Sequence, residues 1–209
     1  VLQQLVDIDS GSFSPVGVNR MADICEGRFD DLGWRVERIR HESDEGGAQL
    51  GDLLIGRSPA NEGPRILIIG HTDTVFDDGT ATERPFSVEG DLAYGPGVSD
   101  MKSGLLSGFF ALEALQELGV PSGNVTYVCN PDEEIGSPFS GSHIKELAGV
   151  ADVALVLESG REDGSVVSQR KGVVDFTINI SGVAAHAGVE PERGRSALVE
   201  AAHLTLALH

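Results

Sequence analysis

Cysteine is nearly absent, since the 209 residues contain only Cys25 and Cys129. Two cysteines so far apart are too few for a disulfide framework or a thiolate metal site. They favour a reducing compartment, so we expect a cytoplasmic protein. Long apolar runs are absent too: none approaches the roughly 18 residues of a membrane span. The segment VLQQLVDIDSGS at the start also lacks the basic and then apolar pattern of a signal peptide.

Positive charge is scarce, because 15 Lys and Arg stand against 33 Asp and Glu, for a formal net charge of -18 at pH 7. A balance this acidic excludes nucleic acid and anionic membranes as expected partners. It suits cation binding, although we expect most of these carboxylates to lie on a solvated surface. Hydrophobic residues make up 40% of the chain and charged residues 23%, a composition that excludes a disordered chain or a coiled coil.

Strand patterns and helix patterns alternate along most of the chain. Short, nearly continuous apolar runs predict strands that are buried in a sheet, and apolar residues at helical spacing predict the helices between them. Ser14-Pro15 and Gly33 supply start and stop signals for the first long helix. The alternation predicts an α/β fold, with a mostly parallel sheet and helices on both faces. The predicted strands are 65–70, 125–130 and 152–158, and the predicted helices are 15–32, 102–118 and 141–148.

The pattern changes after Gly172. Apolar residues from Val174 to Ile180 alternate strictly with polar ones, which predicts a strand over 173–180 with one solvated face. A loop rich in Gly and Ala follows, and then a helix from about Ser196 to the end. We therefore predict one domain over residues 1–170 and the start of a second over residues 171–209.

Charged side chains gather where the predicted strands end. Because the carboxyl ends of parallel strands meet at one edge of an open sheet, these side chains are expected to lie close together. Converging carboxylates repel one another unless cations neutralise them. A histidine with several carboxylates suits zinc or a similar divalent ion, and this many carboxylates suggests two ions with a shared ligand. The residues concerned are His71, Asp73, Asp100, Asp132, Glu133, Glu134 and Glu158.

Each of these residues has a simpler interpretation when it is taken alone. A His-x-Asp sequence after a strand is often a turn with a solvated histidine, and an Asp-Glu-Glu run is often a solvated turn or the start of a helix. Asp100 could be only an N-terminal cap for the helix that follows. Glu158 is harder to dismiss, because an unpaired carboxylate is costly to bury at the end of an apolar strand. Four other histidines are interpreted as structural or surface residues: His41, His143, His203 and His209.

Five ordered sequence blocks resemble the M20 metallopeptidases, and within them most of all the glutamate carboxypeptidase branch. Together they span essentially the whole chain. The resemblance implies a zinc-dependent exopeptidase fold, in which an inserted α+β lid that mediates dimerisation follows the catalytic, metal-binding domain. The blocks are GHTDTV (70–75), YGPGVSDMKSG (94–104), NPDEEIGSP (130–138), LES (157–159) and AAHAGVEPERGRSA (184–197).

The resemblance also implies a metal site. Asp100 would bridge two Zn²⁺ ions, with His71 and Glu158 on one ion and Glu134 on the other. Co²⁺ and Mn²⁺ are alternatives, because ligand type alone does not choose between these metals. The peptide bond between Asp100 and Met101 is expected to be cis.

Three further residues receive catalytic or supporting roles from the resemblance. Glu133 would be the general base for the attacking water. Asp73 would accept a hydrogen bond from the ring nitrogen of His71 that faces away from the metal, which fixes the tautomer of that ligand. His186 matches a lid histidine that in dimeric members reaches the active site of the partner subunit.

The function that the resemblance implies is hydrolysis of an amide or peptide bond, with release of a C-terminal amino acid from a small or peptide-like substrate that carries a free carboxylate. A homodimer through the lid is expected. N-acyl amino acid deacylase or dipeptidase activity is the alternative within the family. The alternative of another class is a non-catalytic metal-binding fragment or interaction module. The chain looks like an N-terminal part without the downstream histidine ligand and substrate-binding arginine, so we expect residues 1–209 alone to bind at most one zinc ion well and to be inactive.

Overall fold

The computed structural model describes residues 1–43, 45–172, 174 and 176–208. These residues divide into two compact units, Val1–Ser165 and Val166–His209. The division falls slightly before the boundary predicted near residue 171, and the functions predicted for the two domains stay predictions. None of the helices in the described ranges has both the length and the apolar character needed to cross a membrane.

A five-stranded sheet with the order β1-β2-β6-β3-β7 forms the centre of the first unit. β3 pairs in parallel with β6 and with β7, whereas β2 pairs antiparallel with β1 and with β6. Only β2 therefore runs against the other strands, and the prediction of a mostly parallel sheet is confirmed. The bounds are β1 (Arg35–Ile39), β2 (Leu53–Arg57), β3 (Arg65–His71), β6 (Asn124–Asn130) and β7 (Val153–Val156).

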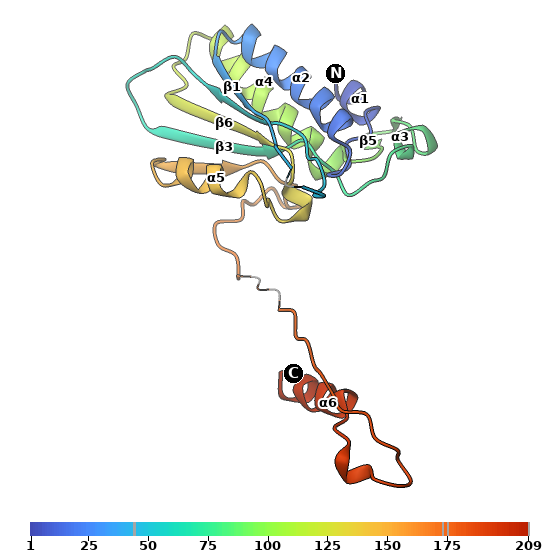
Figure 1. Ribbon diagram of the computed structural model, residues 1–209. Helices are drawn as coiled ribbons and strands as arrows, with labels where there is room; N and C mark the ends of the chain where they lie inside the picture. The colour runs from blue at the N-terminus through green and yellow to red at the C-terminus, as the bar shows by residue number, and fades with distance from the viewer. Residues whose placement is uncertain (44, 173, 175, 209) are drawn as a thin grey trace. The chain divides into compact units, whose positions relative to one another are not determined.

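Helices cover both faces of this sheet, as predicted. Figure 1 shows α2 and α4 together on one face and α5 on the other. A short hairpin of β4 and β5 lies between α3 and α4 in the chain. The helices are α1 (Leu2–Val6), α2 (Pro15–Asp31), α3 (Thr80–Glu83), α4 (Ser103–Glu117), α5 (Gly141–Ala148) and α6 (Ala197–Leu208), and the hairpin strands are β4 (Ser87–Glu89) and β5 (Leu92–Tyr94).

An aromatic cluster fixes α2 and α4 against the sheet. The ring of Phe109 in α4 lies 4.9 Å from Phe29 in α2 and 4.8 Å from Tyr127 in β6, measured between centroids. The buried Tyr127 hydroxyl donates to the backbone oxygen of Leu105 at 2.7 Å, so its polar group is paired. On the other face, Leu67 and Val128 belong to a second apolar cluster, which packs against α5. Packing on both faces of the sheet thus fixes β3 and β6, and the charged residues follow at the ends of these two strands.

The second unit differs from its prediction in one element. The prediction of a strand over 173–180 is wrong for the described residues, because residues 174 and 176–180 form no regular structure and Phe176 is 82% exposed. A strand needs a backbone partner, and among the described residues the only pairing in this unit is the isolated bridge between Val183 and Arg195. Residues 173 and 175 lie outside the described residues. The helix predicted from Ser196 is confirmed as α6.

Candidate metal centre

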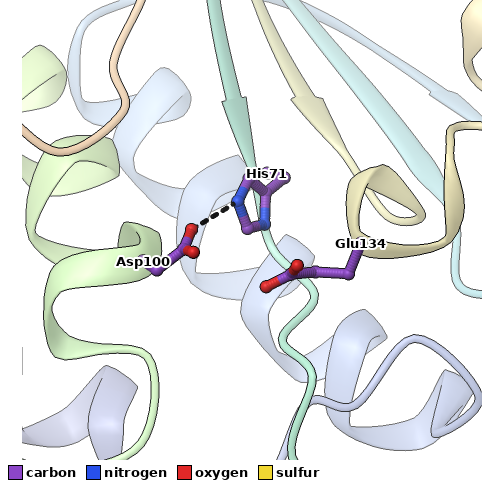
Figure 2. A group of neighbouring side chains, drawn as sticks. All are labelled: His71, Asp100 and Glu134. Carbon is purple, nitrogen blue, oxygen red and sulfur yellow. Dashed lines mark hydrogen bonds and ion pairs between the residues drawn. The ribbon is translucent and has the colours of Figure 1, made fainter. Parts of the chain in front are cut away.

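The charged cluster lies at the carboxyl edge of the sheet, where parallel strands end side by side. His71 is the last residue of β3, and its cross-strand partner is Asn130, the last residue of β6. A single turn after β6 (Glu133–Ile135) carries Glu133 and Glu134. Asp100 lies at a kink in the segment Val98–Lys102, directly before α4, where its own backbone is not helical (φ -123°, ψ 96°). Figure 2 shows the side chains of His71, Asp100 and Glu134 directed toward a common space from these three elements.

The Nε2 atom of His71 is surrounded by carboxylate oxygens. It lies 3.1 Å from Oδ1 of Asp100, 3.6 Å from Oε1 of Glu158 and 4.0 Å from Oε2 of Glu133. Two sets of potential ligand atoms each lie within 4.8 Å of one another: His71 with Asp100 and Glu134, and His71 with Glu133 and Glu158. The structure thus brings together all the residues predicted as metal ligands and the predicted base. Which carboxylates are ligands stays a prediction, because Glu133 and Glu158 lie in the same set.

Asp73 holds the ring of His71 in place. Nδ1 of His71 lies 2.9 Å from the backbone oxygen of Asp73 and 3.3 Å from its carboxylate Oδ1, and both side chains are buried. The nearer acceptor is therefore the main-chain oxygen of Asp73, with its carboxylate beside it. A proton on Nδ1 that is held in this way leaves Nε2 free to bind a cation.

The Asp73 carboxylate also organises the turn that carries the two glutamates. Its Oδ1 accepts the backbone N–H of Glu133 at 3.1 Å, and its Oδ2 accepts the backbone N–H of Glu134 at 3.1 Å. A third donor is the buried hydroxyl of Ser12, 2.7 Å from Oδ2. The sequence did not predict a role for Ser12, because its hydrogen bond to Asp73 joins residues 61 positions apart and no local pattern indicates it.

The close approach of several ionisable groups raises the pKa values of Glu134 and His71. Partial burial, together with the charge of Asp100, raises the pKa of Glu134 to about 7. Burial alone would lower the pKa of His71, but the hydrogen bond and charge of Asp73, with the charge of Glu158, outweigh it and raise the pKa to about 9. A carboxyl group and an imidazole that retain protons to this degree suit a cation site, since a divalent ion replaces those protons with positive charge. The residues therefore fit one or two divalent ions.

The surroundings of Asp100 and Asp132 distinguish their roles. Asp100 is not the N-cap of α4, because Lys102 occupies that position. The peptide bond from Asp100 to Met101 is cis, as expected. The side chain of Asp132 is buried, and its Oδ2 accepts the backbone N–H of Phe139 at 2.7 Å, so Asp132 supports the loop before α5, and it belongs to neither set of potential ligands found among the described residues.

His186 belongs to the second unit, whereas the residues of the cluster belong to the first. Its side chain is exposed there, and Nδ1 accepts the backbone N–H of Gly188 at 3.2 Å. The predicted role of His186 in a partner's active site stays a prediction.

Comparisons with known proteins show which sequences and structures this chain resembles. Carboxypeptidase G2 from Pseudomonas sp. (strain RS-16) is 37% identical over 207 residues, which are 98% of this chain and 49% of that protein. The structure of the aminopeptidase PepT from Bacillus cereus matches with a TM-score of 0.67 at 26% identity, over 96% of this chain and 53% of that one. The M20 family metallo-carboxypeptidase Sso-CP2 from Sulfolobus solfataricus matches with a TM-score of 0.63 at 22% identity, over 78% and 38%, which shows a shared fold.

The chain spans about half the length of the curated relatives it matches. The profile of Peptidase family M20/M25/M40 matches residues 67–209, a range that includes every residue of the charged cluster. This match covers more than half of the chain, and the resemblance seen in the five sequence blocks is thereby confirmed. The chain belongs to peptidase family M20/M25/M40.

Proposed function

We propose that the protein carrying this chain is a metal-dependent hydrolase that cleaves an amide or peptide bond and releases a C-terminal amino acid. The observation that carries the proposal is the convergence of four carboxylates on the imidazole of His71, three of them within 4.0 Å of its Nε2 atom, at the carboxyl edge of the sheet. Family membership and 37% identity to a carboxypeptidase support the choice of reaction.

This chain would supply four of the residues that hold two Zn²⁺ ions, His71, Asp100, Glu134 and Glu158, with Asp100 shared between the ions. When bound, such ions lower the pKa of a water molecule toward neutrality and polarise a carbonyl group. The chain itself positions the ligands: Asp73 fixes the ring of His71 and the backbone of the turn that carries Glu134.

Glu133 would move the proton. Its side chain is 47% exposed and its Oε2 atom lies 4.0 Å from Nε2 of His71, so the carboxylate would be accessible to a substrate and a water molecule beside the metal. The Asp73 carboxylate fixes the backbone of Glu133, so the Glu133 side chain extends from a fixed position. The carboxylate would accept a proton from the attacking water and then deliver it to the leaving amine.

The substrate would be a small or peptide-like amide whose released amino acid has a free carboxylate, as in glutamate release. An N-acyl amino acid deacylase or a dipeptidase would use the same residues on a different acyl group. The full protein would act as a homodimer, with His186 reaching the partner's site.

A substrate panel on the full-length, zinc-loaded protein tests the proposal. The panel contains N-acyl amino acids, α- and γ-glutamyl amides and dipeptides, and amino acid release is measured before and after chelation. We expect amide turnover that chelation abolishes and zinc restores. Turnover that survives complete removal of metal, or the absence of turnover on every amide, would contradict it.

A further inference from the structure

A buried lysine lies close to the metal centre, and the function proposed above gives it no role. Among the described residues, Lys102 is the only lysine or arginine that is buried, with 1% of its surface exposed. Burial of an ammonium group is costly unless polar partners compensate it. Its Nζ atom donates a hydrogen bond of 2.8 Å to the backbone oxygen of Ile8, and the carboxylates of Asp7 and Asp9 interact with it electrostatically. Lys102 thus connects the first segment of the chain to the kinked segment that carries Asp100.

Three consecutive residues of that kinked segment make three different contacts. Oδ1 of Asp100 lies 3.1 Å from Nε2 of His71 (Figure 2). The sulfur of the buried Met101 accepts the backbone N–H of His71 at 3.2 Å. The side chain of Lys102 extends instead to the backbone oxygen of Ile8. Lys102 therefore anchors the backbone from which both contacts with His71 are made.

The segment that Lys102 contacts also reaches Asp73, on the other side of the metal centre. The backbone N–H of Thr74 donates to the oxygen of Ser10 at 2.8 Å, and the backbone N–H of Ser12 donates to the oxygen of Thr74 at 3.2 Å. The hydroxyl of Ser12 donates to the carboxylate of Asp73. Residues 8–12 are therefore fixed both to the kinked segment and to the residue that organises the site.

Together these contacts form a closed series around the metal centre. It runs from Asp100 through Lys102 to residues 8–12, then to Asp73 and to His71, whose Nε2 atom faces Asp100 again. A cation would bind at the link between Asp100 and His71. Because the other links are hydrogen bonds or covalent bonds, they hold these two ligands at a set separation, which a metal site of defined geometry needs.

Close packing confines the side chain of Lys102. Its backbone N–H donates to the oxygen of Gly97 at 2.9 Å, and Gly97 has a positive φ of 71°. A Cβ atom at Gly97 would lie 3.1 Å from Cε of Lys102 and 2.7 Å from Cγ2 of Thr74. The lysine side chain thus has little freedom on its way to Ile8, so its hydrogen bond fixes the position of the kinked segment.

We propose that Lys102 is a positioning residue of the metal centre, which holds Asp100 at the separation from His71 that a divalent ion requires. Lys102 acts through residues 8–12 and touches neither the metal nor the substrate. The inference rests on the proposed function, because it concerns the metal that this function uses.

Zinc affinity and the absorption spectrum of bound Co²⁺ test this role on the full-length protein, because both respond to the geometry of the ligands. Lys102→Met keeps a similar side-chain volume but removes the ammonium group. We expect zinc to bind about tenfold more weakly and the Co²⁺ spectrum to change. A folded Lys102→Met protein with unchanged zinc affinity and an unchanged spectrum would overturn the inference.

Two control variants separate positioning from a general loss of stability. Lys145→Met makes the same change at an exposed lysine on α5. Leu112→Ala removes a buried side chain from the second half of α4 and lowers stability without a contact to the metal centre. Both controls should keep the zinc affinity and the Co²⁺ spectrum of the unmodified protein. An equal loss of affinity in Leu112→Ala would overturn the positioning role.

A double-mutant cycle tests the path through residues 8–12. If Lys102 and Ser12 support the same arrangement, the effects of their replacement on zinc affinity are not additive. Ser12→Ala alone should weaken zinc binding about threefold, and Lys102→Met in that background should then cost about threefold instead of about tenfold. A tenfold loss in that background would overturn the inference, because the two residues would then act independently.

Hydrogen exchange tests the same link without a substitution, and so covers the case in which Lys102→Met does not fold. Zinc should slow the exchange of the backbone N–H groups of Ser12 and Ser14 in the unmodified protein, because the metal completes the series of contacts that holds this segment. Unchanged exchange at both groups would overturn the inference. None of these measurements needs amide turnover. Zinc binding that depends on Lys102 in a protein that hydrolyses no amide supports the inference and refutes only the proposed reaction.

Discussion

The Asp73 carboxylate accepts the backbone N–H of Glu134 at 3.1 Å, so a residue two positions after His71 fixes the turn that follows a different strand. The same carboxylate accepts the backbone N–H of Glu133, and the main-chain oxygen of Asp73 faces Nδ1 of His71. One buried residue thus sets the relative position of the imidazole, through its main-chain oxygen, and of the two glutamates, through its carboxylate.

Replacement of Asp73 tests this arrangement. In Asp73→Asn the side chain keeps one acceptor oxygen, and its NH₂ group faces a backbone N–H that then has no acceptor. We expect zinc affinity to fall by about 10- to 100-fold, as is typical when a residue that orients metal ligands is replaced. Calorimetric zinc titration measures it. Glu117→Gln at the far end of α4 is the control, and an Asp73→Asn protein with unchanged zinc affinity would contradict the role.

Replacement of Ser12 should also weaken zinc binding, because Ser12 donates a hydrogen bond to Asp73, but the effect should be smaller than that of Asp73→Asn. Ser12→Ala removes one of the donors to Asp73 and leaves the negative charge in place, so we expect a loss of about 1–3 kcal/mol in the free energy of unfolding, with a smaller drop in zinc affinity than in Asp73→Asn. Chemical denaturation and zinc titration check the two effects. Ser12→Thr keeps the hydroxyl and should recover most of the stability, and Ser14→Ala should cost little, because the Ser14 side chain makes no capping hydrogen bond. A Ser12→Ala protein as stable as the unmodified one would be inconsistent with this contact.

Zinc binding should depend on pH. Without metal, the pKa of His71 is about 9 and that of Glu134 about 7, so both groups hold protons that a cation must displace. Raising the pH removes these competing protons, so zinc affinity should rise from about pH 6 toward about pH 9, with proton release on binding. Calorimetry in two buffers of different ionisation enthalpy counts the protons. An affinity that is flat or falls over this range would refute the assignment of these groups as ligands.

The proposed homodimer has its own test. If His186 acts in the partner's site, a mixture of His186→Ala and Glu133→Gln proteins forms some dimers in which one site carries neither change. We expect partial recovery of turnover after subunit exchange, although each variant alone is nearly inactive. A verified mixed dimer without recovery would show that His186 does not act across the interface.

The sequence predicted the elements that carry uninterrupted apolar patterns. β3 and β6 are apolar runs buried in the sheet, and α4 repeats its apolar residues at helical spacing, so local pattern and tertiary position agree. Because parallel strands end at one edge, the convergence of His71 with Glu134 followed from the order of those elements.

Other features depend on contacts that sequence patterns do not encode. β1 mixes charged and apolar residues without a clean alternation, and it becomes a strand through its pairing with β2. Ser12 reaches Asp73 only through the folded chain. Conversely, 173–180 has a strand pattern, but the described residues supply no neighbour for it to pair with.

If Glu133 moves the proton while its neighbours hold the metal, Glu133→Gln in the full-length protein separates these two roles. Metal content by mass spectrometry and amide turnover are measured on the same preparation, with Glu134→Gln beside it. We predict that Glu133→Gln keeps the metal content of the unmodified protein and loses about 10²- to 10⁴-fold in turnover, whereas Glu134→Gln loses metal. Loss of metal in Glu133→Gln together with its retention in Glu134→Gln would contradict the account and exchange the roles of the two residues.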